Sequence, residues 1–285
     1  MTRDRNDTLN KDQTAGAMQR LFDPLNRIAQ KPLGRLLLTA LVVFGVLLTV
    51  LVATRLGDRP DPLPDFSAIE QVPERKQAFF DFLAPEVFDA NQRIREQRER
   101  LLQIAAAAEQ GDPPGMFDRR WLGRLSERYE VEWNPEQPLA RLSVLRERVD
   151  VVPVPLALVQ AATESGWGRS RFAVEGNNLF GQWCYVRGCG IVPAQRVSGA
   201  AHEVAAFDSV RESVRRYLLN LNTHEAYEPV REIRAGLRQS DQPVTAMALA
   251  DGLIRYSERR EAYVEEIKTV LRVNRSLLER VGGTL

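Results

Sequence analysis

Residues 36–54 form an uninterrupted stretch of 19 residues without a charged side chain, from Leu36 to Thr54. As a helix rising about 1.5 Å per residue, this stretch covers roughly 28 Å, close to the hydrocarbon thickness of a bilayer. A signal peptide is the nearest alternative, but its apolar part spans only about 7 to 15 residues after a short basic head, whereas 35 residues precede this stretch. A buried core helix is the less common alternative, because most globular helices keep a polar face. We therefore predict a single transmembrane anchor over residues 36–54, with the lipid bilayer as its partner.

The basic residues around this anchor predict its orientation. Four Lys/Arg lie shortly before it and two shortly after it: Arg20, Arg27, Lys31 and Arg35, then Arg55 and Arg59. The positive-inside rule then makes residues 1–35 a cytoplasmic tail and places the rest in the periplasm, outside a bacterial inner membrane. The formal net charge of +1 argues against a nucleic-acid partner, because a dedicated binder needs a marked basic excess.

The exported part divides by composition into three segments. Residues 55–73 contain four prolines among charged residues, which predicts an extended, stiff stalk. Residues 74–149 form a helical extension, with helices expected over 85–109, 117–130 and 138–149 from the spacing of their apolar residues. Residues 150–285 form the domain in which the chemistry is expected.

That domain begins with a helix that leads to a carboxylate. Pro155 suits a first helical turn, and mostly apolar residues follow up to Glu164, where Gly166 and Gly168 end the helix. Residues 176–207 are rich in glycine and aromatic residues, which is typical of short strands, and further helices are expected from Ser209 onwards. The expected fold class is α+β, mostly α, with a small β lobe.

Glu164 is the strongest candidate for acid catalysis. It lies in the last helical turn, where the helix dipole disfavours its charged form, and Trp167 can shield it from water. Both effects raise the pKa of a carboxyl group toward the range in which it donates a proton at neutral pH. A solvated or salt-bridged glutamate at a helix end is the plainer interpretation.

Two motifs resemble the glucosaminidase family of peptidoglycan hydrolases, glycoside hydrolase family 73. They are Thr163-Glu164-Ser165-Gly166-Trp167-Gly168 and Gly176-Asn177-Asn178-Leu179-Phe180-Gly181. The continuation Gln182-Trp183-Cys184, Gly188-Cys189-Gly190, His202-Glu203-Val204 and Asn220-Leu221-Asn222-Thr223-His224 is most similar to the Bax-like, membrane-anchored branch. The resemblance covers roughly residues 150–275.

The resemblance implies a lysozyme-like catalytic domain that cuts the β-1,4 bond after N-acetylglucosamine in the glycan strands of peptidoglycan. It makes Glu164 the general acid and places a functionally important tyrosine at Tyr227, for which closing a helix pair is the structural alternative. No cofactor or metal is expected, and the protein partners stay unknown.

A glycosidase usually pairs its acid with a second carboxylate. Between Glu175 and Glu203 there is no Asp or Glu, so Glu203 is the candidate by elimination, against the alternative of an ordinary strand residue. If Glu203 does not take this role, the acetamido group of the substrate can assist Glu164 instead.

Several side chains near these motifs are candidates for sugar binding. The aromatic ones are Trp167, Phe180, Trp183 and Tyr256, and the amides are Asn177 and Asn178. Core packing explains Trp167 and Phe180 equally well, and turn formation is the plainer account of the two asparagines.

Cys184 and Cys189 are the two cysteines of the chain. In an oxidising compartment they are expected to form a disulfide worth about 2 kcal/mol. A zinc site with His202 and His224 is the alternative, although the spacing of the histidines fits no usual ligand pattern.

The predicted function is that of a membrane-anchored peptidoglycan hydrolase. Two alternatives stay open at this point. A lytic transglycosylase needs only one catalytic glutamate and leaves anhydro-muramic ends. A wall-binding protein with an inactive cleft is compatible with an uncertain second carboxylate.

Overall fold

The computed structural model describes residues 36, 39–49, 61–194 and 202–282. The chain divides into two units, Met1–Arg59 and Pro60–Leu285. In the first unit, residues 36 and 39–49 are helical with exposed side chains, while residues 37–38 and 50–54 of the predicted anchor lie outside the described residues. Among the described residues, no helix has both the length and the apolar character needed to cross a membrane. The cytoplasmic tail predicted over 1–35 also lies outside the described residues.

The second unit is mostly helical, and its longest helix is α3, Val72–Glu109. The other helices of eight or more residues are α4 Met116–Arg128, α6 Val154–Ser165, α8 Val210–Thr223, α9 Glu228–Gln239 and α11 Glu261–Val273. The shorter ones are α5 Leu142–Arg148, α7 Arg171–Gly176, α10 Ala246–Ala250 and α12 Arg275–Arg280, with 3₁₀ turns η1 Phe66–Ala68, η2 Glu225–Tyr227 and η3 Asp251–Arg255. This composition confirms the α+β, mostly α class.

Helix α6 lies at the centre of the main core. Apart from Thr163 and Glu164, all of its side chains are buried, which is typical of a helix with apolar residues on every side. Helices α3, α10 and α11 contact α6, and buried residues of α8 belong to the same core. Gly166 ends α6 in the left-handed conformation with φ 59°, as expected for a glycine after a helix.

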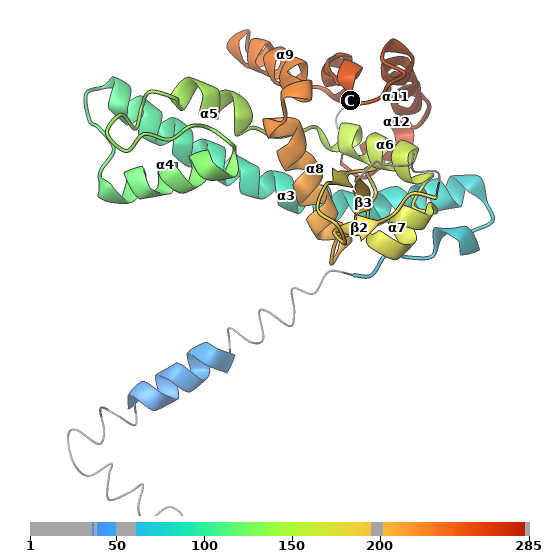
Figure 1. Ribbon diagram of the computed structural model, residues 1–285, viewed down its shortest axis with the longest axis horizontal. Helices are drawn as coiled ribbons and strands as arrows, with labels where there is room; N and C mark the ends of the chain where they lie inside the picture. The colour runs from blue at the N-terminus through green and yellow to red at the C-terminus, as the bar shows by residue number, and fades with distance from the viewer. Residues whose placement is uncertain (1–35, 37–38, 50–60, 195–201, 283–285) are drawn as a thin grey trace, which may run out of the picture. The chain divides into compact units, whose positions relative to one another are not determined.

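A second, smaller core joins the end of α3 to α4 and α5, and its buried residues include Leu101, Leu122, Leu125 and Leu145. Figure 1 shows α4 and α5 along one end of α3, with α8 crossing that helix, and α3 contacts both α5 and α8. The helices predicted for this extension are therefore confirmed as elements, with shifted ends.

The two cores meet around Asp150, a buried carboxylate. Arg238 donates to both of its oxygens at 3.1 Å, and Arg98 and Arg234 lie within ion-pair distance. The predicted boundary between extension and catalytic domain thus falls on a shared cluster of charges inside one compact unit.

The start of this unit differs from the prediction in two ways. Helix α3 begins at Val72 rather than at Pro85, which lies inside the helix. In the predicted stalk, Phe66 is buried in the main core, where it packs on Phe79 and Phe82. A Cβ on Gly168 would lie 2.5 Å from the Phe66 ring, so this part of the stalk packs directly under the loop that follows α6.

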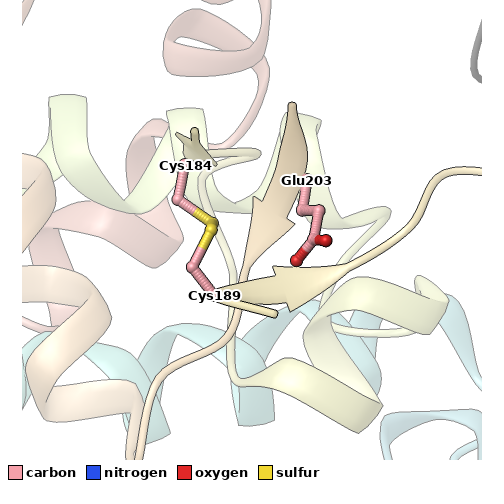
Figure 2. A group of neighbouring side chains, drawn as sticks. All are labelled: Cys184, Cys189 and Glu203. Carbon is pink, nitrogen blue, oxygen red and sulfur yellow. A yellow bond between two sulfur atoms is a disulfide. The ribbon is translucent and has the colours of Figure 1, made fainter. Parts of the chain in front are cut away.

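The small β lobe consists of three short antiparallel strands in the order β1-β3-β2. They are β1 Trp183–Cys184, β2 Gly190–Ile191 and β3 Glu203–Ala205, with Cys184 opposite Glu203 and Gly190 opposite Ala205. Cys184 and Cys189 form a disulfide, which confirms that prediction (Figure 2). The bond closes the connection between β1 and β2 and holds the two outer strands of the lobe together.

Candidate active site

The carboxyl group of Glu164 faces a cavity of about 500 Å³. Burial raises the pKa of Glu164, while a hydrogen bond from the Tyr263 hydroxyl, at 2.8 Å from Oε1, and the charge of Arg259 oppose that effect. Gly181 lies beside Glu164 in the cavity wall and has φ 64°. A Cβ at this position would lie 3.6 Å from Glu164 Oε2. A glycine at 181 therefore keeps the space in front of the carboxyl group open.

A buried chain of hydrogen bonds holds Glu164 in place. The Tyr217 hydroxyl donates to Gln160 Oε1 at 2.5 Å, and Gln160 Nε2 donates to the Tyr263 oxygen at 3.0 Å. Because Tyr263 accepts from the amide, its own proton is directed at Glu164. Gln160 lies one helical turn before Glu164, so α6 itself aligns the two side chains.

Neither Gln160 nor Tyr263 is among the site residues predicted from the sequence. One signal was available, because Gln160 is a polar residue in the middle of an otherwise apolar helix, where a buried amide needs partners. Nothing in the local sequence links Tyr263 to Glu164, since 99 residues separate them.

The cavity wall combines aromatic and polar side chains. The aromatic ones are Phe180, Trp183, Tyr185, Tyr227 and Tyr256, and the polar or charged ones include Gln182, Asn220, His224, Arg255, Ser257 and Glu258. Flat aromatic rings beside amides and hydroxyls offer both stacking and hydrogen-bonding partners to a ligand with apolar faces and polar edges. Trp183 is 57% exposed, and His202 stacks on one face of its ring with the centroids 4.3 Å apart, so the opposite face is the one available for such contact.

Two tyrosines lie deep in this wall. Burial, together with the charge of Glu164, raises the pKa of Tyr227 to about 12. The Tyr256 hydroxyl donates to the Phe180 carbonyl at 2.9 Å, and its ring stacks on Tyr263. At neutral pH both hydroxyls are therefore protonated and can serve as neutral donors or packing surfaces.

Comparisons with known proteins agree with this geometry. A family model described as "Glucosaminidase: Mannosyl-glycoprotein endo-beta-N-acetylglucosaminidase" matches residues 142–276. "Protein bax" of Escherichia coli (strain K12) is 34% identical over 225 residues, which cover 79% of this chain and 79% of that protein. The chain belongs to the glucosaminidase family. No solved structure matches the chain.

Membership of this family, glycoside hydrolase family 73, makes the chain a glycoside hydrolase that acts on peptidoglycan. The matched region begins in α5 and includes every residue of the cavity wall named above. Most of the helical extension, including α3 and α4, precedes the match.

Of the predicted sugar-binding residues of this glucosaminidase, Phe180, Trp183 and Tyr256 line the cavity and Trp167 does not. Trp167 packs on Phe79 and Phe80 in the core, with Lys76 over its ring. Phe180 lines the cavity although only 2% of the residue is exposed. Its ring stacks on Tyr217.

The two predicted asparagines shape the backbone instead of lining the cavity. Asn177 has φ 52° at the end of α7, and its amide donates to the Phe207 carbonyl at 2.9 Å. Asn178 is buried, and its amide donates to the carbonyls of Gln182 and Ala205. Their amides therefore link the loop after α7 to β3, in line with the plainer account.

The structure does not bring Glu203 to the cavity that Glu164 faces. Its carboxylate is buried in the β lobe, where it accepts from the backbone N–H of Gly188 at 3.1 Å and of Gly190 at 2.9 Å (Figure 2). The position differs from the predicted catalytic one because β3 pairs with β1 and β2 and directs this side chain into the turn between them.

The carboxylate that joins Glu164 in the cavity wall is Glu258, on the loop between η3 and α11. The sequence analysis did not consider it. Among the described residues, the cluster with metal-ligand atoms close together is Cys184, Cys189 and Glu203, whose two sulfurs are joined to each other (Figure 2). It contains neither histidine of the zinc alternative.

Proposed function

We propose that this glucosaminidase hydrolyses the β-1,4 bond after N-acetylglucosamine in peptidoglycan glycan strands, with Glu164 as the general acid. The observation that carries the proposal is a half-buried carboxyl group with a raised pKa, facing a cavity lined with aromatic and amide groups. A raised pKa keeps a larger share of the carboxyl group protonated at a given pH, and the protonated form can give its proton to the leaving glycosidic oxygen.

The surroundings of Glu164 support proton donation. Tyr263 fixes one carboxyl oxygen by its hydrogen bond, so the other oxygen, Oε2, is the one beside Gly181 at the open side. The proton is transferred from this oxygen to the glycosidic oxygen as the bond between that oxygen and the anomeric carbon breaks, and a water that gives its proton to the second group forms the new bond to the anomeric carbon. Trp183 and Tyr227 supply ring faces against which the sugars can stack.

For the second group, we propose Glu258 in place of Glu203. Glu258 is exposed and lines the same cavity as Glu164, which suits a base that accepts a proton from an attacking water. Replacing Glu258 with Gln should then lower the rate strongly. Full activity of that variant would instead assign the step to the acetamido group of the substrate.

We further propose that residues 36–54 anchor the protein in the inner membrane, with its N-terminus in the cytoplasm. The uncharged stretch and the basic residues before it support this topology. The disulfide supports a periplasmic location, because disulfides persist in oxidising compartments. Protease added to spheroplasts should digest the part that follows residue 55, and protection of that part would contradict the topology.

Product analysis tests the proposed reaction. Digestion of purified sacculi should release muropeptides with reducing N-acetylglucosamine ends, identified by mass spectrometry after borohydride reduction. Anhydro-muramic ends would instead show a lytic transglycosylase. Binding to sacculi without any released product would show a wall-binding protein. The Glu164→Gln variant is the matched control for each result.

A further inference from the structure

Helices α3, α4 and α8 enclose a cavity of about 420 Å³ that is separate from the one facing Glu164. Its charged and large aromatic lining consists chiefly of Arg93, Glu96, Arg100, Trp121, Arg128 and Arg215. Two arginines come from α3, one from the end of α4 and one from α8. Four arginines from three helices therefore line one hollow.

Four arginines face three carboxylates, which are Glu96 in the lining and the ion-pair partners Asp89 and Asp118, so one positive charge is left over. Asp89 is shared by Arg93 at 3.2 Å and Arg215 at 3.1 Å, while Asp118 pairs with Arg100 at 3.0 Å. Arg128 makes no ion pair with any carboxylate among the described residues. The Nε of Arg215 is buried and has no hydrogen-bond partner in the described part of the chain. The guanidinium of Arg128 is therefore the one available to an anionic ligand among the described residues, whereas the buried Nε of Arg215 is not exposed to the cavity.

The chemistry of these donors favours a carboxylate ligand. A guanidinium presents a planar fork of N–H groups that matches the two oxygens of a carboxylate. Arg100 is held over the Trp121 ring at 4.5 Å, which fixes the plane of its guanidinium. The ring also provides an apolar surface beside the charges, as a peptide with both methyl and carboxylate groups requires.

The position of this cavity connects it to the catalytic one. An intermediate cavity of about 290 Å³ shares Gln182, Trp183 and Asn220 with the catalytic cavity and shares Leu219 with the arginine-lined one. Asn220 and Arg215 lie five residues apart on α8, a rise of about 7.5 Å. At about 100° per residue the two side chains also lie about 140° apart around the helix axis, so a peptide branch from a substrate at Asn220 has to pass around α8 by way of the intermediate cavity to reach the arginines, and extended chain covers about 3.4 Å per residue.

We propose that the arginine-lined cavity binds the carboxylates of the peptide stems attached to the glycan strand. The proposal rests on the proposed function, because it names the part of the same substrate that lies beyond the catalytic cavity. It also gives a role to α3 and α4, which lie outside the matched family region. The protein would thereby prefer strands that carry peptides over strands from which the peptides have been removed.

The test compares two substrates with the full chain. One is intact sacculi, and the other is glycan strands stripped of peptides by an amidase. The variant is Arg93→Gln/Arg128→Gln, which keeps hydrogen-bonding groups of similar size but removes two charges. We expect the apparent KM for intact sacculi to rise about tenfold, with kcat unchanged and with no change on stripped strands. Arg120→Gln/Arg124→Gln, two exposed arginines on α4 that do not line the cavity, is the charge-matched control.

An equal loss on both substrates, or no loss on either, would overturn the proposal. Failure of the proposed function is a separate result, in which the wild type cleaves neither substrate. Co-sedimentation of the Glu164→Gln protein still decides the question in that case. The proposal is supported if the Glu164→Gln protein binds intact strands more strongly than stripped strands and loses this preference when Arg93→Gln and Arg128→Gln are added. Equal binding of the Glu164→Gln protein to both kinds of strand overturns the proposal.

Discussion

Glu164 at the cavity and Glu203 in the β lobe are both shielded from solvent, Glu203 more than Glu164. They differ in the hydrogen-bond donors that their carboxyl groups meet. Among the described residues, the Glu164 carboxyl group accepts a hydrogen bond from Tyr263, and its second oxygen is at the open side of the cavity. At Glu203 the oxygens accept from the backbone N–H groups of Gly188 and Gly190. A carboxylate held by several donors is stabilised in its charged form, whereas a sparsely bonded, buried one favours its protonated form.

The comparison shows that burial alone does not distinguish a catalytic glutamate from a structural one. Glu203 is the more deeply buried of the two, yet its carboxylate serves as an acceptor that closes the turn between β1 and β2 (Figure 2). Glu164 combines partial burial with access to a cavity. Four substitutions test this difference.

The largest effect is expected for Glu164→Gln, which removes the proton donor while keeping the shape of the side chain. Release of muropeptides should fall by about 10²- to 10⁴-fold. The melting temperature at neutral pH should not decrease, because a neutral amide is easier to bury than a carboxylate. Chromatography of the digestion products and thermal unfolding measure the two properties. An active Glu164→Gln variant would remove the central role of this residue.

Glu203→Ala should mainly affect stability. The backbone N–H groups of Gly188 and Gly190 would lose their acceptor, at an expected cost of about 3 kcal/mol in the free energy of unfolding. Urea unfolding followed by circular dichroism measures this change. Activity per folded molecule should stay within a few-fold of the wild type. A loss of activity as large as that of Glu164→Gln, in a folded protein, would restore Glu203 as a catalytic residue.

Cys184→Ser tests how much the disulfide contributes to the stability of the same β lobe. Loss of the disulfide should lower the free energy of unfolding by about 2 kcal/mol under oxidising conditions, because the ring that it closes is short. In the presence of a reductant, the wild type and the variant should unfold at similar temperatures. An unchanged melting temperature without reductant would show that the bond adds nothing to the stability of the lobe.

Tyr263→Phe should have the smallest effect and changes the pH profile more than the rate. The hydrogen bond from Tyr263 lowers the pKa of Glu164, which burial has raised. Removing this bond therefore raises the pKa further. Activity needs the protonated acid and is lost as pH rises through that pKa, so the alkaline limb of the profile should move to higher pH. A shift to lower pH would contradict the direction of the Tyr263 hydrogen bond.

Several structural features of this glucosaminidase can be predicted from short stretches of its sequence. The apolar pattern before Glu164 and the glycines after it predicted α6 and its end, and the spacing of Cys184 and Cys189 predicted their bond. These features depend on residues within a few positions of each other. The start of α3 was misplaced because a proline inside a helix, Pro85, resembles a proline at its beginning.

The site residues that sequence reasoning misjudged depend on contacts between distant segments. Trp167 follows Glu164 directly, yet its ring turns into the core because Phe79 and Phe80 of α3 offer an apolar surface. Glu203 was selected by elimination along the chain, a procedure that ignores the loop that brings Glu258 into the cavity from beyond η3.

The sequence by itself determined the helix that presents Glu164, the glycines around it, the disulfide and the family to which the chain belongs, because each is encoded in short, contiguous motifs. Tertiary structure alone decided which groups surround that glutamate. Tyr263 and Glu258 lie more than 90 residues after Glu164 in the chain, and the separate arginine-lined cavity likewise combines residues of α3, α4 and α8. A pKa, a cavity wall and a charge cluster arise from distances in space, and those distances are set only when the helices pack.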